Sequence, residues 1–337
     1  MNYKETLKNA RVNLNGACRV CPVCNGKACA GEVPGMGGKG TGDAFKANID
    51  ALAEFKLNMR VIHNAANPNT SIEIFGKKMS LPVFAAPVSG TTLNMGGKFT
   101  EKEYISWVIG GCLDGGIIPM VGDTAVDSFL LDNLEELNKF KGEGIAIIKP
   151  WENSNVIKKL KLAEDAGVIA VGMDIDAAGL ITLALHGKPV GPKNVESIRE
   201  IALSTKLPFI LKGIMTVDEA LLAVEAGVDA IVVSNHGGRV LDQTPGVADV
   251  LYDIAEAVKG KVKILADGGV RNGVDVLKMI ALGADAVLIG RPFVAASFGG
   301  QRVGVKNYIE TIHSELKSAM VLTGCNSILE INERIIY

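Results

Sequence analysis

The sequence predicts an α/β protein: a (β/α)8 barrel that follows an N-terminal extension. From residue 81 onward, a short aliphatic or β-branched run, a turn and a helical stretch follow one another eight times. The apolar runs are continuous and do not alternate with polar residues, which is typical of parallel strands covered on the outside by helices. Glycine is frequent and aromatic residues are few, which favours repeated short elements joined by tight turns.

The eight apolar runs each have the length of a barrel strand. They are residues 81–88, 116–122, 144–150, 168–175, 207–213, 230–236, 262–269 and 286–293. Between them, residues 216–226 show helical spacing, with Thr216 as a suitable N-cap and Gly227 as a suitable C-terminal glycine. A doubly wound sheet would need a glycine fingerprint after the first strand, and residues 85–90 do not supply one. A TIM barrel is therefore the preferred fold.

Two segments lie outside the regular repeat. We expect residues 1–80 to form an N-terminal extension and residues 81–337 to form the barrel. The long connection at residues 177–200 is either a lid over the barrel mouth or a packed surface excursion, and the sequence leaves both open.

Composition and charge exclude several kinds of partner. The chain has 337 residues, of which 35 are basic and 37 acidic, and it has no basic run, so nucleic acid is not an expected partner. The N-terminus lacks the apolar core of a signal peptide and no apolar run is long enough to cross a bilayer. We therefore expect a cytoplasmic protein that does not bind membranes.

Charged and polar side chains gather at the C-terminal ends of the predicted strands, which face one pocket in a barrel. These strand-end residues are Asp123, Lys149, Asp174, Asp176, Lys212, Ser234, His236, Asp267, Arg271 and Arg291. Residues 266–271 and 289–292 add glycine-rich turns, each with an arginine, which favours a phosphate site. The alternative is that these turns only need the conformational freedom of glycine.

The sixth predicted strand indicates the reaction. His236 stands at its end and Arg239 follows three residues later. A neutral imidazole can take a proton near pH 7, and a guanidinium can bind a carboxylate with two hydrogen bonds. That pair suits a 2-hydroxy acid, whose hydroxyl and carboxylate lie close together.

These motifs resemble one known family. The runs 234–239, 241–242, 267–271, 282–284 and 289–292 are similar to the FMN-dependent alpha-hydroxy acid oxidases and dehydrogenases, such as glycolate oxidase and lactate oxidase. The likeness is dense from residue 207 to the C-terminus and looser from 40 to 176. It implies an enzyme that oxidises a small L-2-hydroxy acid to the 2-oxo acid, with FMN as the hydride acceptor. It also implies a homo-oligomer, since relatives are often tetramers.

The resemblance implies a role for each matching position. His236 would be the base, Asp176 would stabilise its imidazolium form, and Arg239 would bind the substrate carboxylate. The FMN-binding residues would be Pro87, Val88, Ser89, Lys212, Ser234, Asp267, Gly268, Gly269, Arg271, Gly290 and Arg291.

The chain also departs from the family pattern. A second carboxylate-binding arginine is missing, with Leu183 near its place, and so is the N-terminal tyrosine. Lys149 follows Ile147-Ile148 where Gln-x-Tyr is usual, while Asp174 replaces a threonine and Gly122 a serine. Lys149 either helps to bind the substrate or only pairs with Asp174.

Four cysteines form the second departure. Cys18, Cys21, Cys24 and Cys29 supply thiolates that could hold zinc or an iron–sulfur cluster. They could also be redox-active thiols or incidental cysteines. A cluster would suggest that electrons leave to a carrier protein. Two other functions stay open: an FMN-dependent isomerase like type 2 isopentenyl diphosphate isomerase, and a flavoprotein that only docks a redox partner.

Overall fold

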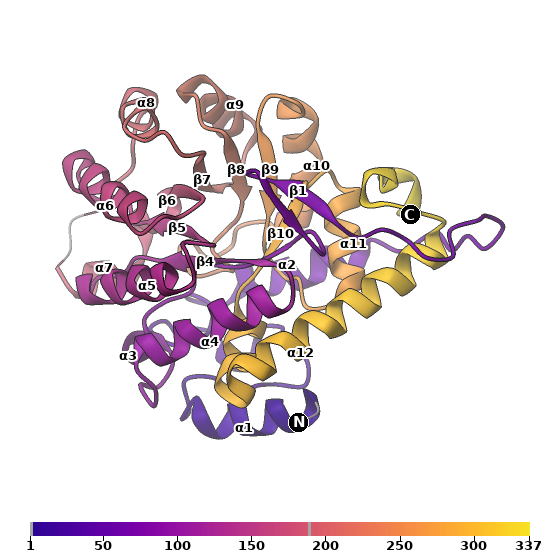
Figure 1. The fold of residues 1–337 in the computed structure, drawn as a ribbon, viewed down its shortest axis with the longest axis horizontal. Helices are drawn as coiled ribbons and strands as arrows, with labels where there is room; N and C mark the ends of the chain where they lie inside the picture. Colours follow the sequence, from indigo (N-terminus) through magenta and orange to yellow (C-terminus); the bar gives the residue numbers. More distant parts are fainter. Residues whose placement is uncertain (1–2, 188–189) are drawn as a thin grey trace.

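The computed structural model describes residues 3–187 and 190–337, and its centre is a closed barrel of eight parallel strands (Figure 1). The strand order around the barrel is β10-β3-β4-β5-β6-β7-β8-β9. The strands are β3 (Val83–Ala85), β4 (Ile118–Gly122), β5 (Ile145–Ile148), β6 (Ala170–Asp174), β7 (Phe209–Ile214), β8 (Ala230–Val233), β9 (Lys263–Ala266) and β10 (Ala286–Ile289). The predicted barrel is confirmed, and each predicted run contains one of these strands or overlaps it.

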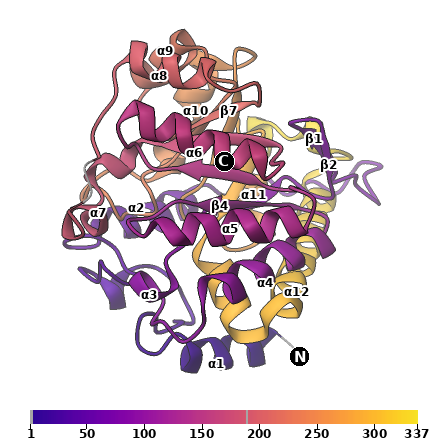
Figure 2. The same cartoon turned by 60° about the vertical axis from the view of Figure 1, so that its left-hand side comes forward.

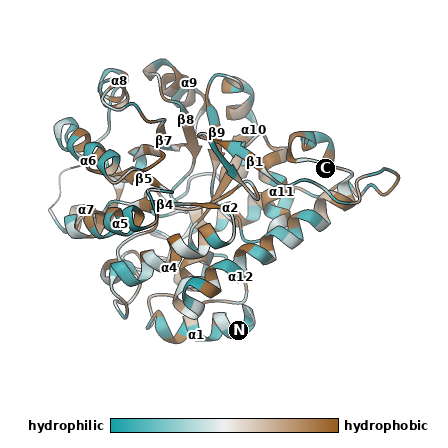
Figure 3. Cartoon of the chain, viewed as in Figure 1, coloured by the Kyte–Doolittle hydropathy of each residue, from teal (hydrophilic) through white to brown (hydrophobic). Residues whose placement is uncertain are grey.

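Helices cover the outside of the barrel (Figure 2). They are α4 (Glu101–Asp114), α5 (Asp127–Lys139), α6 (Asn153–Asp165), α8 (Val195–Leu203), α9 (Val217–Ala226), α10 (Val247–Val258), α11 (Gly273–Ala281) and α12 (Arg291–Thr323). The expected ends of α9 are confirmed: the Thr216 side chain accepts a hydrogen bond from the Glu219 N–H, and Gly227 adopts φ +83°. The strands are hydrophobic and the helices show mixed faces (Figure 3), because the core lies inside the barrel and between the two layers.

Residues 3–80 pack directly on the barrel. Helix α1 (Tyr3–Asn13) lies along α12, and Gly299 of α12 approaches so closely that a Cβ there would lie 1.9 Å from the Thr6 carbonyl oxygen. Helix α2 (Asp43–Glu54) packs against α10. The short helix η1 (Lys27–Cys29) and the hairpin of β1 (Ile72–Ile74) and β2 (Lys77–Met79) complete this segment. The division of domains at residue 80 stays a prediction.

The connection after β6 contains two short helices, η2 (Ile175–Gly179) and α7 (Ile181–Leu185). It brings Leu180, Thr182 and Leu183 to the wall of the cavity described below. This part of the connection therefore lines the cavity, while residues 188–189 lie outside the described residues. A further short helix, α3 (Thr91–Asn94), faces the same cavity from the β3 side.

Among the described residues, no helix combines the length and apolar character needed to cross a membrane. The cytoplasmic location stays a prediction. At the C-terminus, η3 (Ile328–Glu330) and η4 (Glu333–Ile335) follow α12, and the chain end pairs with Leu57 through Ile336.

Candidate active site

A cavity opens at the C-terminal ends of the barrel strands. Its empty volume is about 1070 Å³, counting the space at its open mouth, which is the size expected for a cofactor together with a small substrate. Most of the predicted site residues line it. They are Pro87, Val88, Ser89, Lys149, Lys212, His236, Arg239, Asp267, Gly268, Gly269, Arg271, Gly290 and Arg291.

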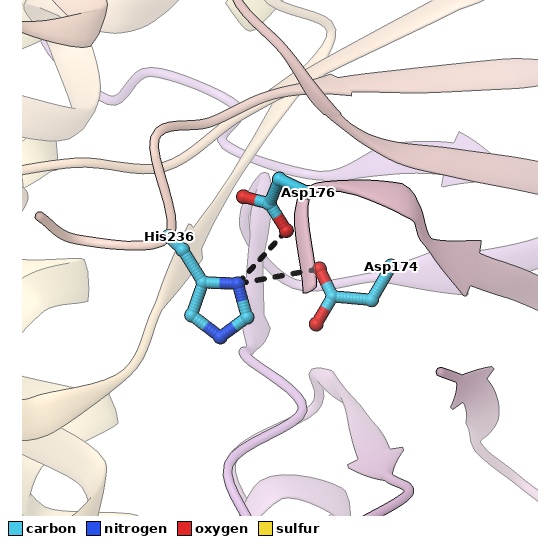
Figure 4. Close-up of side chains that lie close together, drawn as sticks. All are labelled: Asp174, Asp176 and His236. Carbon is cyan, nitrogen blue, oxygen red and sulfur yellow. Dashed lines mark hydrogen bonds and ion pairs between the residues drawn. The ribbon is translucent and has the colours of Figure 1, made fainter. Parts of the chain in front are cut away.

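His236 is held by a carboxylate from the neighbouring part of the barrel. Its Nδ1 lies 2.9 Å from Asp176 Oδ1 and 3.5 Å from Asp174 Oδ1, and the other ring nitrogen points away from both carboxylates (Figure 4). Since a carboxylate accepts hydrogen bonds, Nδ1 carries the hydrogen and Nε2 keeps its lone pair. The backbone at His236 has φ +57°, a conformation that histidine tolerates better than most residues, and it turns the ring toward the cavity.

Asp174 is the centre of a buried charge network. Its two oxygens accept from Lys149 Nζ at 2.6 Å and from Lys212 Nζ at 3.0 Å. Burial alone would raise the pKa of Asp174, but the charges of His236, Lys149 and Lys212 outweigh it and hold that pKa well below its usual value. Lys149 was expected either to bind the substrate or to pair with Asp174. It forms the pair with Asp174, and it also lies at the cavity wall.

Lys212 stays protonated because carboxylates surround its ammonium group. Burial would lower the pKa of Lys212, but Asp174, Asp176 and Asp267 raise it above its usual value. The ammonium group is therefore a permanent cation at the floor of the cavity, where a cation can stabilise negative charge on a bound ring.

Ser234 is not at the cavity wall, although the sequence suggested direct contact with the cofactor. Its hydroxyl accepts from the His236 backbone N–H at 3.0 Å and from Lys212 Nζ at 3.1 Å, and it donates to Asp267 Oδ2 at 2.9 Å. The side chain is fully buried. Ser234 thus positions its neighbours and has no free donor or acceptor of its own to offer.

Arg239 and Arg291 bind main-chain carbonyls of the N-terminal segment. Arg239 donates to Gly35 O at 2.6 Å and Gly37 O at 3.1 Å, and Arg291 donates to Met36 O at 2.7 Å and Gly37 O at 3.0 Å. Among the described residues, neither forms a salt bridge with a carboxylate, and the same holds for Arg271. Burial lowers the pKa of Arg239 to about 9, and the neighbouring Arg291 cation contributes. This wall is therefore a buried positive region that lacks an anion.

The polar atoms left without partners fit FMN. Asp267 Oδ1 and Arg271 Nε are buried and have no hydrogen-bond partner. A carboxylate oxygen can accept from a ribityl hydroxyl, and a guanidinium N–H can donate to a phosphate. Gly268 and Gly269 have φ values of +80° and +88°, so the chain turns tightly beside the cavity, and helix α12 begins with its N-terminus next to Gly290.

The sequence matches the FMN-dependent dehydrogenase family over residues 35–184 and 187–337. The chain belongs to this family. Its relatives include a 4-hydroxymandelate oxidase of Amycolatopsis orientalis, 31% identical over 336 residues that cover 87% of this chain and 89% of the relative. An L-lactate dehydrogenase of Xanthomonas campestris pv. campestris is 32% identical over 359 residues, covering 88% of this chain and 89% of the relative.

Solved structures agree with the family assignment. A structure of mandelate oxidase superposes with a TM-score of 0.80 at 28% identity, covering 100% of this chain and 97% of that one. A mandelate oxidase variant with benzoyl-formic acid gives a TM-score of 0.81 at 29% identity, covering 99% of this chain and 97% of that one. The FMN-dependent dehydrogenase family thus accounts for the barrel and its cofactor cavity.

One further site residue, Asn94, has no signal in the sequence, and a second, Asp123, is marked only by its place at a strand end. Asn94 accepts from Arg239 Nη2 at 3.0 Å and from the Gly35 N–H at 3.2 Å. Asp123 accepts from Lys159 Nζ at 2.9 Å in a buried ion pair and also lines the cavity.

The four cysteines of the N-terminal segment do not line the cavity. They are half-buried free thiols, and they lie behind the wall formed by Arg271 and Arg291. The closest link is between Arg271 Nη2 and Cys24, at 3.4 Å to its carbonyl oxygen and 3.7 Å to its sulfur. The family match begins at residue 35, after the last of the four cysteines.

Proposed function

We propose that this chain oxidises a small L-2-hydroxy acid to the 2-oxo acid with FMN as its cofactor. The observation that carries the proposal is the orientation of His236, whose Nδ1 is tied to Asp176 while Nε2 is left for a substrate in a cavity that Arg239 also lines. The names of the relatives support the same chemistry, since they act on 4-hydroxymandelate, L-lactate and, in Arabidopsis thaliana, (S)-2-hydroxy acids.

His236 acts as the base. Its Nε2 accepts the proton of the substrate hydroxyl, and the resulting imidazolium is stabilised by Asp176 at 2.9 Å and by Asp174 at 3.5 Å. The chemistry that bound FMN would supply is acceptance of a hydride from the alpha carbon, which would store the two electrons. The Lys212 cation, held by Asp174 at 3.0 Å, lies where it can balance the negative charge that this uptake creates.

Arg239 binds the substrate carboxylate. Three of its five N–H groups are used by Gly35, Gly37 and Asn94, so Nε and one hydrogen of Nη2 remain for a carboxylate. Its attachment to the N-terminal segment fixes the plane of the guanidinium before the substrate arrives, which lowers the entropy cost of binding. Lys149 and Lys212 both pair with Asp174, so this buried carboxylate is neutralised and does not repel the substrate.

The cofactor residues divide by the part of FMN they would hold. Arg271, Arg291 and the backbone around Gly269 and Gly290 would bind the phosphate, and Asp267 would bind the ribityl hydroxyls. The chain at residues 87–89 would lie along the ring. Arg291 donates three of its N–H groups to the carbonyl oxygens of residues 36, 37 and 237. The two N–H groups of Nη1 remain for the phosphate.

Anaerobic mixing of the FMN-loaded protein with a panel of 2-hydroxy acids tests this function. We expect the yellow flavin absorbance to bleach with at least one L-2-hydroxy acid and with no D enantiomer. A protein that binds FMN but bleaches with none of the panel would contradict the proposal. If it then isomerised an isopentenyl diphosphate with reduced FMN, the isomerase alternative would replace it. The homo-oligomeric state stays a prediction, which gel filtration with light scattering can measure.

A further inference from the structure

The cysteine segment, residues 18–29, is built as a binding loop although nothing in the proposed reaction uses it. All four thiols are free and partly buried. The segment contains two backbone positions in the left-handed region, Val20 at φ +45° and Gly26 at φ +80°, which fold it back on itself between the cysteines. Such folding brings residues that are close in sequence around one common centre.

The four cysteines fall within twelve consecutive residues of one short loop, and the backbone reverses twice between them, at Val20 and Gly26. A zinc ion holds four thiolate sulfurs about 3.8 Å apart, given bonds of about 2.3 Å. Among the described residues, no three of these sulfurs lie within 4.8 Å of one another. The thiols therefore do not form a compact zinc site in this conformation, whereas four cysteines at this spacing in the sequence can hold a larger iron–sulfur centre.

The charge around the cysteine segment also favours an anionic centre. Arg271 Nη2 lies 3.7 Å from Cys24 Sγ, and Arg271 and Arg291 both line the neighbouring wall of the cavity. These arginines have no carboxylate partner among the described residues. A cluster bound by four thiolates is anionic, so it would supply the missing negative charge from behind the wall, while a phosphate supplies it from the cavity side.

The backbone already provides a donor to sulfur. The Val20 N–H lies 3.4 Å from Cys18 Sγ, and N–H donation to the ligand sulfurs is one of the features that tune iron–sulfur centres. The carbonyl oxygen of Cys29 accepts from the Gly38 N–H at 3.2 Å, next to the residues that bind Arg239 and Arg291. Hydrogen bonds through residues 37 and 38 therefore connect the cysteine segment to Arg239 and Arg291.

We propose that Cys18, Cys21, Cys24 and Cys29 bind a [4Fe–4S] cluster beside the phosphate end of the FMN cavity. Cys18, Cys21 and Cys24 match the C-x2-C-x2-C run that supplies three ligands of one ferredoxin cluster, and Cys29 would supply the fourth from the same loop. The role of the cluster rests on the proposed function. Oxidation of one 2-hydroxy acid releases two electrons and two protons; the protons would pass to solvent, and a one-electron centre would pass the electrons singly to two molecules of an oxidised one-electron carrier protein.

Metal analysis of the full chain, purified without oxygen, tests the site independently of activity. We expect about four iron and four acid-labile sulfide per chain, and an electron paramagnetic resonance signal after reduction by dithionite. The Cys24→Ala and Cys21→Ala variants should lose the iron and sulfide but keep the FMN absorbance. The matched controls Cys112→Ala and Cys325→Ala remove buried cysteines outside the segment and should keep both.

Three outcomes would overturn the proposal. The first is stoichiometric zinc without iron. The second is a protein that takes up no metal during anaerobic reconstitution with ferrous iron and sulfide, so that all four thiols still react freely. The third is iron retained in both cysteine variants. Because iron is measured on wild-type protein, a variant that fails to fold does not decide the result. Bleaching by 2-hydroxy acids in the same sample separates failure of the cluster from failure of the proposed function.

Discussion

The imidazole of His236 and the carboxylate of Asp176 form a 2.9 Å hydrogen bond across the barrel mouth, although 60 residues separate them in the chain. Asp176 lies just after β6 and His236 lies just after β8. The order of the strands brings the two loops together, because only β7 stands between β6 and β8 in the sheet. The bond fixes which nitrogen of His236 carries its hydrogen and therefore which nitrogen can act as the base.

Asp176→Asn should lower kcat by about a hundredfold or more while the KM for the substrate changes little. An amide can still occupy the space but cannot stabilise a charged imidazole, so the loss falls on the step in which His236 becomes positive. Steady-state kinetics, with FMN content as the check on folding, measures both constants. A raised KM with an unchanged kcat would mean that Asp176 serves binding only.

Arg239→Met should raise the KM for a 2-hydroxy acid about a hundredfold, since it removes two charge-assisted hydrogen bonds to the carboxylate. Lys149→Met is the matched variant, because it removes a cation from the same cavity wall. Because Lys149 already pairs with Asp174 at 2.6 Å, we expect the KM of the Lys149→Met variant to differ from that of wild type by about threefold or less. Equal effects of the two variants would show that Lys149 binds the substrate as well.

The pKa of Asp174 is held well below its usual value, which predicts a pH-dependent stability. The unfolded chain takes up a proton at this side chain near pH 4, whereas the folded chain does so only at lower pH. The stabilisation is thus complete above about pH 5 and is lost as the pH falls through the folded-state pKa. Urea unfolding at several pH values measures this. The free energy of unfolding of wild type should exceed that of Asp174→Asn above about pH 5, and the difference should disappear below about pH 4. A difference that grows on acidification would contradict this.

Asp242→Ala should loosen the N-terminal segment. The Asp242 carboxylate accepts from the Thr41 N–H at 2.6 Å, the Thr41 hydroxyl at 2.8 Å and the Asp43 N–H at 3.1 Å, and so it caps the start of α2. We expect faster limited proteolysis in residues 30–45 and a higher KM, because Gly35 and Gly37 orient Arg239. Asp253→Ala, on the exposed face of α10, is the control and should match wild type.

The sequence predicted those parts of the fold and site that follow from local patterns. Continuous apolar runs predict the eight strands. Because the C-terminal ends of barrel strands face one pocket, the sequence also predicts that His236, Asp176 and Lys212 lie close together. The ends of the strands were less certain because apolar residues continue past them. In the last run, Pro292 and Phe293 extend the pattern but already belong to α12.

Contacts between distant segments could not be predicted. The bonds from Arg239 to Gly35 and Gly37 join residues more than 200 positions apart, and the glycine-rich segment gives no sign of its partner. The burial of Ser234 depends on three neighbours from different strands. The pair of Lys149 and Asp174 was one of two open alternatives. The parallel register of Ile148 with Met173 explains the pair, since the next residue on each strand lies side by side.

Anaerobic stopped-flow reduction of FMN-loaded His236→Ala is the most direct test of the central claim. The variant should bind FMN as wild type does, because His236 holds no proposed FMN contact, and flavin reduction by the best L-2-hydroxy acid should slow by at least about a hundredfold. His63→Ala, a surface histidine outside the cavity lining, should reduce its flavin at the wild-type rate. Reduction of the His236→Ala flavin at the wild-type rate would contradict the assignment of His236 as the base.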